Sequence, residues 1–167
     1  MCRQKACDYK GHLYVSGGFG YKNTTLCYKP EDNEWTSKAP MIKERSYHSM
    51  LAVEDKIYVL GGCRRCGPRT PEDDNLEDLG CEVYDPLTDQ WTSISWIHQK
   101  LSCTAAVALD QSIFCFGGYS FFHVKEVNLV QICNTKKLSW SSKSMCRNPV
   151  NYYTAVLLWM TNASLKH

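Results

Sequence analysis

The chain has 167 residues, of which 44% are hydrophobic and 22% charged, and its formal net charge at pH 7 is +2. This balance gives no basic footprint for nucleic acid, and no apolar run is long enough to predict a membrane span, so we expect neither as a partner. The first residues, Met1 to Lys5, lack the apolar core of a signal peptide. The ten cysteines are typical of small buried hydrophobes in a reducing compartment, which predicts a cytoplasmic protein.

The first unit, residues 1–40, sets a pattern of an apolar run, a glycine pair and a tryptophan. Its apolar run is Leu13–Ser16, and Tyr28 stands seven residues before Trp35. The pattern returns twice, so that three glycine pairs and three tryptophans are spaced along the chain. They are Gly17-Gly18, Gly61-Gly62 and Gly117-Gly118, followed by Trp35, Trp91 and Trp140. An internal repeat of this size predicts an array of similar units.

The second unit, residues 41–97, is the fullest copy and predicts four strands. In chain order they are Ser46–Val53, Lys56–Leu60, Gly80–Tyr84 and Trp91–Ile94. Residues 85–90 between the last two strands combine aspartate, proline and threonine, which is turn chemistry and indicates a hairpin. No segment keeps a helical period of apolar residues, so we expect no helix. Four short strands in each repeat are typical of a β-propeller blade.

The third unit covers residues 98–148, and a truncated unit begins at 149. Thr154–Val156 resemble Thr104–Val107 of the third unit, but no second strand or glycine pair follows, and residues 158–167 are predicted to be a tail outside the repeat. The predicted fold is therefore all-β: a partial, open β-propeller over residues 1–157, with about three four-stranded blades and an incomplete one. Because an open arc exposes sheet edges, we expect a piece of a larger protein that is oligomeric or poorly soluble alone.

The residues fixed by the repeat are predicted to be structural. Glycine at the end of a strand lets the chain turn sharply and lets a neighbouring backbone come close. A large aromatic side chain fills the wedge between two blades. The residues assigned to these two roles are Gly17, Gly18, Trp35, Gly61, Gly62, Tyr84, Trp91, Gly117, Gly118 and Trp140.

Four submotifs of the second unit resemble one known family. They are Arg45-Ser46-x-His48-Ser49, Lys56–Gly62, Glu82–Pro86 and Trp91, with Pro40-Met41 just before them. Together they resemble a complete kelch repeat, and the chain is most similar to the kelch domains of BTB–kelch proteins, without their BTB part. The resemblance implies that a protein partner docks over the mouth of the central channel. Carried onto this chain, that mouth is lined by Phe19, Arg45, Ser46, Tyr47, Cys63, Leu101, Ser102, Tyr119, Val150 and Asn151.

Two loops beside this mouth carry further candidates. The segment from Cys63 to Leu79 is the largest insertion and separates arginines from acidic residues; it is either a solvated loop or part of a partner-binding rim. The segment 119–123 holds three aromatic residues, which either bind a partner or begin a third strand. The full set of candidate partner-binding residues is Arg45, Ser46, Tyr47, Arg64, Arg65, Tyr119, Phe121 and Phe122. Of these, Arg45 is expected to pair with an acidic peptide.

The sequence predicts no catalytic constellation, no metal and no cofactor. Cys63 and Cys66 form one Cys-x-x-Cys, which is either incidental or a redox or metal site, and it lacks the second pair that structural zinc needs. We therefore expect a protein-interaction module and not an enzyme. The resemblance implies the substrate-recognition part of an adaptor that reaches a cullin-RING ubiquitin ligase through a BTB domain. The alternatives are an actin-associated scaffold and, more remotely, a propeller oxidase.

Overall fold

The computed structural model describes residues 3–20, 22–64, 79–94, 99–120 and 123–144. These residues form strands and turns and contain no helix, as predicted, so none of them forms a membrane-spanning helix. The strands are β1 (Lys5–Tyr9), β2 (His12–Ser16), β3 (Thr25–Lys29), β4 (Glu34–Lys38), β5 (Ser49–Val53), β6 (Lys56–Leu60), β7 (Cys81–Asp85), β8 (Gln90–Ile94), β9 (Ala105–Leu109), β10 (Ser112–Phe116), β11 (Tyr119–Ser120), β12 (Lys125–Glu126), β13 (Leu129–Asn134) and β14 (Ser139–Ser144). The predicted truncated unit and tail lie outside the described residues.

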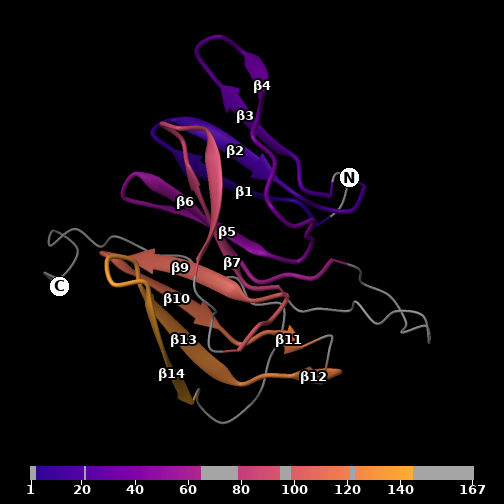
Figure 1. The fold of residues 1–167 in the computed structure, drawn as a ribbon, viewed down its shortest axis with the longest axis vertical. Helices are drawn as coiled ribbons and strands as arrows, with labels where there is room; N and C mark the ends of the chain where they lie inside the picture. Colours follow the sequence, from indigo (N-terminus) through magenta and orange to yellow (C-terminus); the bar gives the residue numbers. More distant parts are fainter. Residues whose placement is uncertain (1–2, 21, 65–78, 95–98, 121–122, 145–167) are drawn as a thin grey trace, which may run out of the picture.

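The strands form three antiparallel four-stranded sheets, which we call blades 1, 2 and 3. Blade 1 has the order β1-β2-β3-β4, blade 2 the order β5-β6-β7-β8 and blade 3 the order β9-β10-β13-β14. The short pair β11-β12 is inserted into blade 3. In Figure 1 the blades follow one another from the top of the view to the bottom, with β1 beside β5 and β5 beside β9. This arrangement confirms the predicted fold class, an all-β, partial and open β-propeller.

The three blades repeat each other down to single backbone positions. The first hairpin of each blade has a left-handed residue with φ of 51–52°: Lys10, Glu54 and Asp110. The second hairpins have one with φ of 48–52°: Asn33, Asp89 and Leu138. Such residues give a tight turn the twist that antiparallel strands need. The register therefore repeats as well, and Tyr28, Tyr84 and Cys133 face Trp35, Trp91 and Trp140 across the last strand pair.

The first strand of blade 2 begins later than predicted. The sequence predicts a strand over Ser46–Val53, but β5 starts at Ser49. Tyr47 has a φ of 57°, and so does Cys103 at the equivalent position before blade 3. A left-handed residue interrupts an extended strand, so residues 45–48 and 101–104 form a separate segment in front of each blade.

Two hydrophobic cores fill the wedges between neighbouring blades. The first lies between blades 1 and 2 and contains Tyr9, Tyr14, Cys27, Met41, Met50, Ile57, Val59, Tyr84 and Trp91. The second lies between blades 2 and 3 and contains Leu51, Val53, Tyr58, Leu60, Cys81, Ile113, Cys115 and Cys133, with Trp140 packed against it. The predicted wedge role is confirmed for Tyr84, Trp91 and Trp140. Trp91 and Trp140 each pack against the blade that precedes their own.

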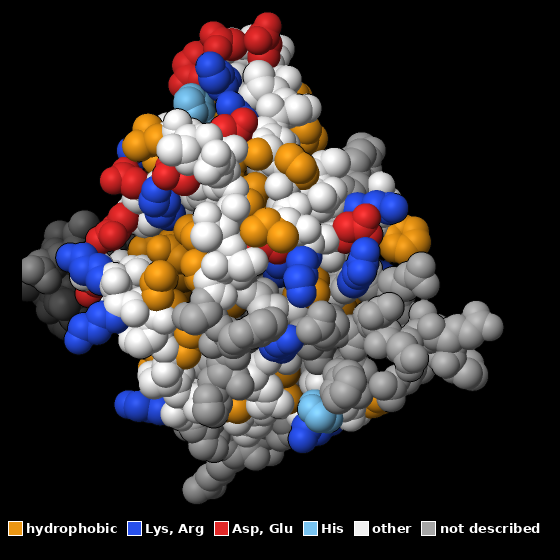
Figure 2. Space-filling view, in the orientation of Figure 1, with side chains coloured by type: hydrophobic (Ala, Val, Ile, Leu, Met, Phe, Trp, Pro, Cys, Tyr) orange, Lys and Arg blue, Asp and Glu red, His pale blue; other side chains and the backbone are white. Residues whose placement is uncertain are grey.

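The same prediction is wrong for Trp35. Its side chain is 54% exposed, whereas Trp91 at the equivalent position of blade 2 is 9% exposed. Since a tryptophan of this repeat packs against the preceding blade, Trp35 faces a side of blade 1 that no described blade covers. Figure 2 shows hydrophobic side chains at the surface over β3 and β4.

The glycine pairs have the close backbone neighbours that the sequence predicts. Gly61 has a φ of +64°, and a Cβ atom on it would lie 2.0 Å from the carbonyl oxygen of Leu101. Its neighbour Gly62 donates its N–H to that same oxygen at 3.0 Å. A side chain at residue 61 would push the segment in front of blade 3 away from blade 2. Gly17 also has a close backbone neighbour, because its Cβ would lie 2.5 Å from the carbonyl oxygen of Arg45.

Candidate partner-binding site

Several predicted mouth residues come together in one backbone ladder, which we call the rim strip: residues 45–47, 63, 101–103 and 119. Ser46 and Cys63 exchange two backbone hydrogen bonds of 3.0 and 2.9 Å. Ser102 and Tyr119 do the same at 2.9 and 2.8 Å. The N–H of Cys103 donates to the carbonyl of Tyr47 at 2.8 Å and joins the two halves. The strip thus runs across the junction of blades 2 and 3.

The predicted aromatic residues of this region remain accessible to a partner. Tyr47 and Tyr119 are half-buried, and Phe19 beside the strip is 72% exposed. The guanidinium of Arg3 lies 4.3 Å from the centre of the Tyr47 ring, a cation–π contact. Ser46 is 8% exposed, so its contribution is mainly the backbone bridge.

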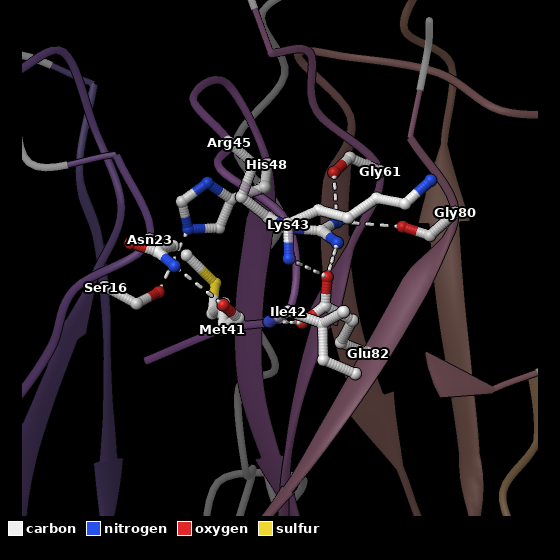
Figure 3. A network of polar contacts seen from close by, with 10 residues as sticks. All are labelled: Ser16, Asn23, Met41, Ile42, Lys43, Arg45, His48, Gly61, Gly80 and Glu82. Carbon is white, nitrogen blue, oxygen red and sulfur yellow. Dashed lines mark hydrogen bonds and ion pairs between the residues drawn. The ribbon is translucent and has the colours of Figure 1, made fainter. Parts of the chain in front are cut away.

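The prediction that Arg45 binds an acidic partner is wrong. Arg45 is 2% exposed, and its guanidinium donates to the carbonyls of Gly61 and Gly80 at 2.7 and 2.8 Å. It also forms an ion pair with Glu82, whose side chain is 1% exposed. Figure 3 shows the guanidinium enclosed by these three partners. All of them belong to the chain itself, so Arg45 holds the segment in front of blade 2 in place.

Glu82 is the residue that sequence reasoning missed. Its carboxylate accepts the backbone N–H groups of Ile42 and Lys43 at 2.7 and 3.1 Å, and it thereby binds the linker between blades 1 and 2 (Figure 3). Gln131 has the same position in blade 3: it accepts the N–H of Gln99 at 2.7 Å and donates to the Gln99 carbonyl at 2.9 Å. The sequence did carry a signal for this role, because Glu82 and Gln131 are polar residues at the same position of two repeats. A polar group buried in a sheet needs a hydrogen-bonding partner, which here is the linker.

Other side chains fix the rest of this linker. The indole N–H of Trp91 donates to the Ala39 carbonyl at 2.9 Å, and the Ala39 N–H donates to Asp89 at 2.9 Å. The Tyr84 hydroxyl also donates to Asp89, at 2.6 Å. These two donors, the Tyr84 hydroxyl first, lower the pKa of Asp89. Trp91 and Tyr84 therefore combine a wedge role with a linker role.

The neutral side chain of His48 lies buried in the junction between blades 1 and 2. It is fully buried, and its Nε2 lies 3.1 Å from the hydroxyl of Ser16. Burial, and then the nearby charge of Arg45, lower the pKa of His48 well below its ordinary value of 6.5. The predicted structural role of His48 is consistent with this environment.

A group of charged residues borders the rim strip. Glu44 lies 3.9 Å from Arg64 and 3.6 Å from Lys22, measured between the charged groups, and the side chains of Arg64 and Lys22 are 57% and 67% exposed. Two cations thus lie beside the Glu44 carboxylate, and a third, Arg3, lies over the Tyr47 ring. Among these described residues the cations outnumber the carboxylate, which favours an acidic partner.

Cys63 offers little surface to a partner, and several other candidates lie outside the described residues. Cys63 is 1% exposed and disulfide-bonded. Within the described ranges, no three His, Cys, Asp or Glu side chains gather into a group that could hold a metal. The candidates outside the described residues are Arg65, Cys66, Phe121, Phe122, Val150 and Asn151.

A surface cavity of about 380 Å³ lies beside the Arg45–Glu82 pair. It is lined by backbone or side-chain atoms of both residues and of Lys43, Ser93 and Ile94. Its two central charges already satisfy each other, so the cavity is a weaker candidate than the rim strip.

Comparison with known proteins agrees with this architecture. Two family models described as "Kelch motif" match residues 1–41 and 44–77. Kelch-like protein 26 of Danio rerio is 35% identical over 133 residues, which are 77% of this chain and 21% of that protein. Kelch-like protein 25 of Xenopus tropicalis is 32% identical over 157 residues, 92% of this chain and 26% of that protein. The chain is a kelch-repeat domain of the kind found in kelch-like proteins.

This kelch-repeat domain spans about a quarter of the length of the curated relatives it matches. A solved structure, that of YjhT, superposes on 89% of the domain with a TM-score of 0.73 at 18% identity, and the match covers 53% of the YjhT chain. At this low sequence identity, the structural likeness to YjhT shows the fold alone. The kelch-like relatives support a protein-interaction module.

Proposed function

We propose that this kelch-repeat domain binds an acidic segment of a protein partner at the rim strip and that it selects substrates for a cullin-RING ubiquitin ligase. The observation that carries the first half is the charge beside the strip: Lys22 and Arg64 lie next to Glu44, and Arg3 lies over the Tyr47 ring. Such a field steers an acidic chain toward the strip and fixes its orientation.

The aromatic residues supply the second part of the binding energy. Phe19 is 72% exposed, and Tyr47 and Tyr119 are half-buried on the same end of the blades. Tyrosine combines an apolar body with a polar tip, and aromatic and arginine residues dominate the energy of most protein interfaces. An acidic peptide with an apolar or aromatic residue fits this combination.

The ligase role rests on the kelch-like relatives and on the length of chain that they contain beyond the matched region. In such an adaptor, the kelch domain holds the substrate while a BTB domain binds the cullin. In this proposal the rim strip is the surface that binds the substrate.

The first experiment selects peptides from a random display library on the immobilised chain. We expect acidic peptides whose affinity falls with rising salt and falls about tenfold or more in the variants Arg64→Glu and Phe19→Ser. The matched control is Lys137→Glu, a charge reversal in the exposed turn between β13 and β14, which should bind as the wild type does. Neutral or basic peptides that ignore both rim substitutions would contradict the proposed site.

The second experiment tests the ligase role. The chain is fused to the BTB part of a kelch-like protein, and a captured partner is incubated in a reconstituted cullin reaction. We expect ubiquitination that is lost with Arg64→Glu and kept with Lys137→Glu. Capture of actin without ubiquitination would favour the cytoskeletal scaffold instead.

A further inference from the structure

We infer that the Glu44 carboxylate is a built-in competitor of the acidic partner: it pairs with Lys22 and Arg64 in the free protein, and a carboxylate of the partner takes its place on binding. The inference rests on the proposed function, because it assumes that an acidic segment binds at the rim strip. It adds a residue that limits the affinity of the site for weakly acidic segments.

The two ion pairs of Glu44 are loose and open to solvent. Its carboxylate oxygens lie 3.6 Å from Nζ of Lys22 and 3.9 Å from Nε of Arg64, and both distances exceed the range of a normal hydrogen bond. The side chains of Lys22 and Arg64 are 67% and 57% exposed, and that of Glu44 is 34% exposed. Exposed pairs of this kind contribute little to stability, so a competing carboxylate displaces Glu44 at small cost.

Backbone hydrogen bonds hold the two segments that carry the cations, independently of the carboxylate between them. The carbonyl of Lys22 accepts the N–H of Arg45 at 3.1 Å. Cys63, which precedes Arg64 in the chain, exchanges its two backbone hydrogen bonds of 3.0 and 2.9 Å with Ser46. Removing the carboxylate should therefore leave both segments beside the rim strip.

The backbone of Glu44 is fixed as well. On one side of it, the N–H groups of Ile42 and Lys43 donate to the Glu82 carboxylate at 2.7 and 3.1 Å. On the other side, the guanidinium of Arg45 forms its buried ion pair with Glu82. This rigid segment keeps a carboxylate next to the rim strip, where it attracts the cations that the partner needs and repels the acidic partner itself.

The sign of one substitution separates a competitor from a positioning residue. If Glu44 competes, removing its charge frees both cations and strengthens the binding of an acidic peptide. If Glu44 instead positioned Lys22 and Arg64 for the partner, the same substitution would weaken binding.

The test measures the binding of a labelled acidic peptide from the display selection to the full chain by fluorescence anisotropy. Glu44→Gln should raise the affinity at least about threefold, since it removes two exposed ion pairs and one repulsion. Glu44→Ala should act in the same direction. The gain should shrink as the salt concentration rises from about 0.05 M to about 0.5 M, because exposed charges are screened. A version of the peptide with amides in place of its carboxylates should show no gain.

The matched control is Glu31→Gln. Glu31 also forms a long ion pair, 3.8 Å from Nε2 of His12, and its side chain is 67% exposed. It lies in the turn between β3 and β4, at the opposite end of these strands from Thr25, which pairs with Ser16 just before the first glycine pair. The affinity of this variant should equal that of the wild type, and circular dichroism should be unchanged in both variants.

A double-mutant cycle with Arg64→Gln identifies the pair that is broken. The loss of affinity from Arg64→Gln should be larger in the Glu44→Gln background, where the arginine is no longer partly neutralised. Equal losses in the two backgrounds, or an affinity of Glu44→Gln at or below that of the wild type, would overturn the inference and leave the proposed function intact. If the chain selects no acidic peptide at all, the proposed function fails and the inference fails with it.

Discussion

Replacing Glu82 with glutamine should destabilise the fold although glutamine is the residue that blade 3 has at the same position. Glu82 and Arg45 have side chains that are each 1% exposed, and they form an ion pair in the junction between blades 1 and 2. In the junction between blades 2 and 3 their places are taken by Gln131 and Leu101, neither of which is charged. The chain thus contains a charged and an uncharged version of one contact.

The size of the effect follows from the burial of the guanidinium. Removing one partner of a buried pair costs about 3–5 kcal/mol, because the remaining charge is left uncompensated. Arg45 would keep its hydrogen bonds to the Gly61 and Gly80 carbonyls. We therefore expect the low end, about 3 kcal/mol, from Glu82→Gln. This is a large share of a domain stability of about 5–15 kcal/mol.

The double variant Arg45→Leu/Glu82→Gln should recover most of that loss. It installs the uncharged pair of the other junction, and replacing a buried ion pair by such residues is often neutral. We expect a free energy of unfolding within about 1 kcal/mol of the wild type, so that the two single substitutions are strongly non-additive.

Urea unfolding, followed by circular dichroism at one fixed protein concentration, measures all four proteins of this cycle. The reasoning would be refuted by a double variant that loses as much stability as the two single variants together. It would equally fail if Glu82→Gln alone were neutral, because the buried charge of Arg45 would then need no partner.

Two further predictions concern the same blade junctions. Gly61→Ala should cost more than about 3 kcal/mol in thermal unfolding, since its Cβ would lie 2.0 Å from the Leu101 carbonyl oxygen. Gly20→Ala, with a φ of +87° but open space around the Cβ, should cost only the backbone penalty of about 1–2 kcal/mol, and equal losses would contradict the steric argument. Because the pKa of His48 is lowered on folding, the unfolded chain binds its proton first as pH falls. The contribution of His48 to stability should therefore be complete above pH 6.5 and fall below it by up to about 1.4 kcal/mol per pH unit. His48→Gln should reduce this slope, and an unchanged slope in the variant would exclude His48 as its source.

The repeat could be predicted from the sequence because its signals are local. Each blade has a glycine pair after an apolar run, and two of them have a tryptophan seven residues after a tyrosine, Tyr28 or Tyr84. These short patterns predict the turn, the strand pairing and the register of a blade. The β8 residue Trp91 illustrates this, since its burial needs only that similar blades stand side by side. The mouth residues Ser46, Tyr47 and Tyr119 follow from the same repeat, and the structure brings them together in the rim strip.

The sequence by itself determined that the chain is built of four-stranded kelch blades, and it predicted partner-binding residues on their connecting segments. Only the tertiary structure decided which members of a repeated position are buried. Trp35 and Trp91 have the same local pattern but different neighbours, and Arg45 lies at the position of Leu101 yet finds Glu82 opposite. Burial and charge pairing depend on the residues that another blade brings close, and those lie 37 residues away in the chain for Arg45 and Glu82, outside the reach of any local pattern.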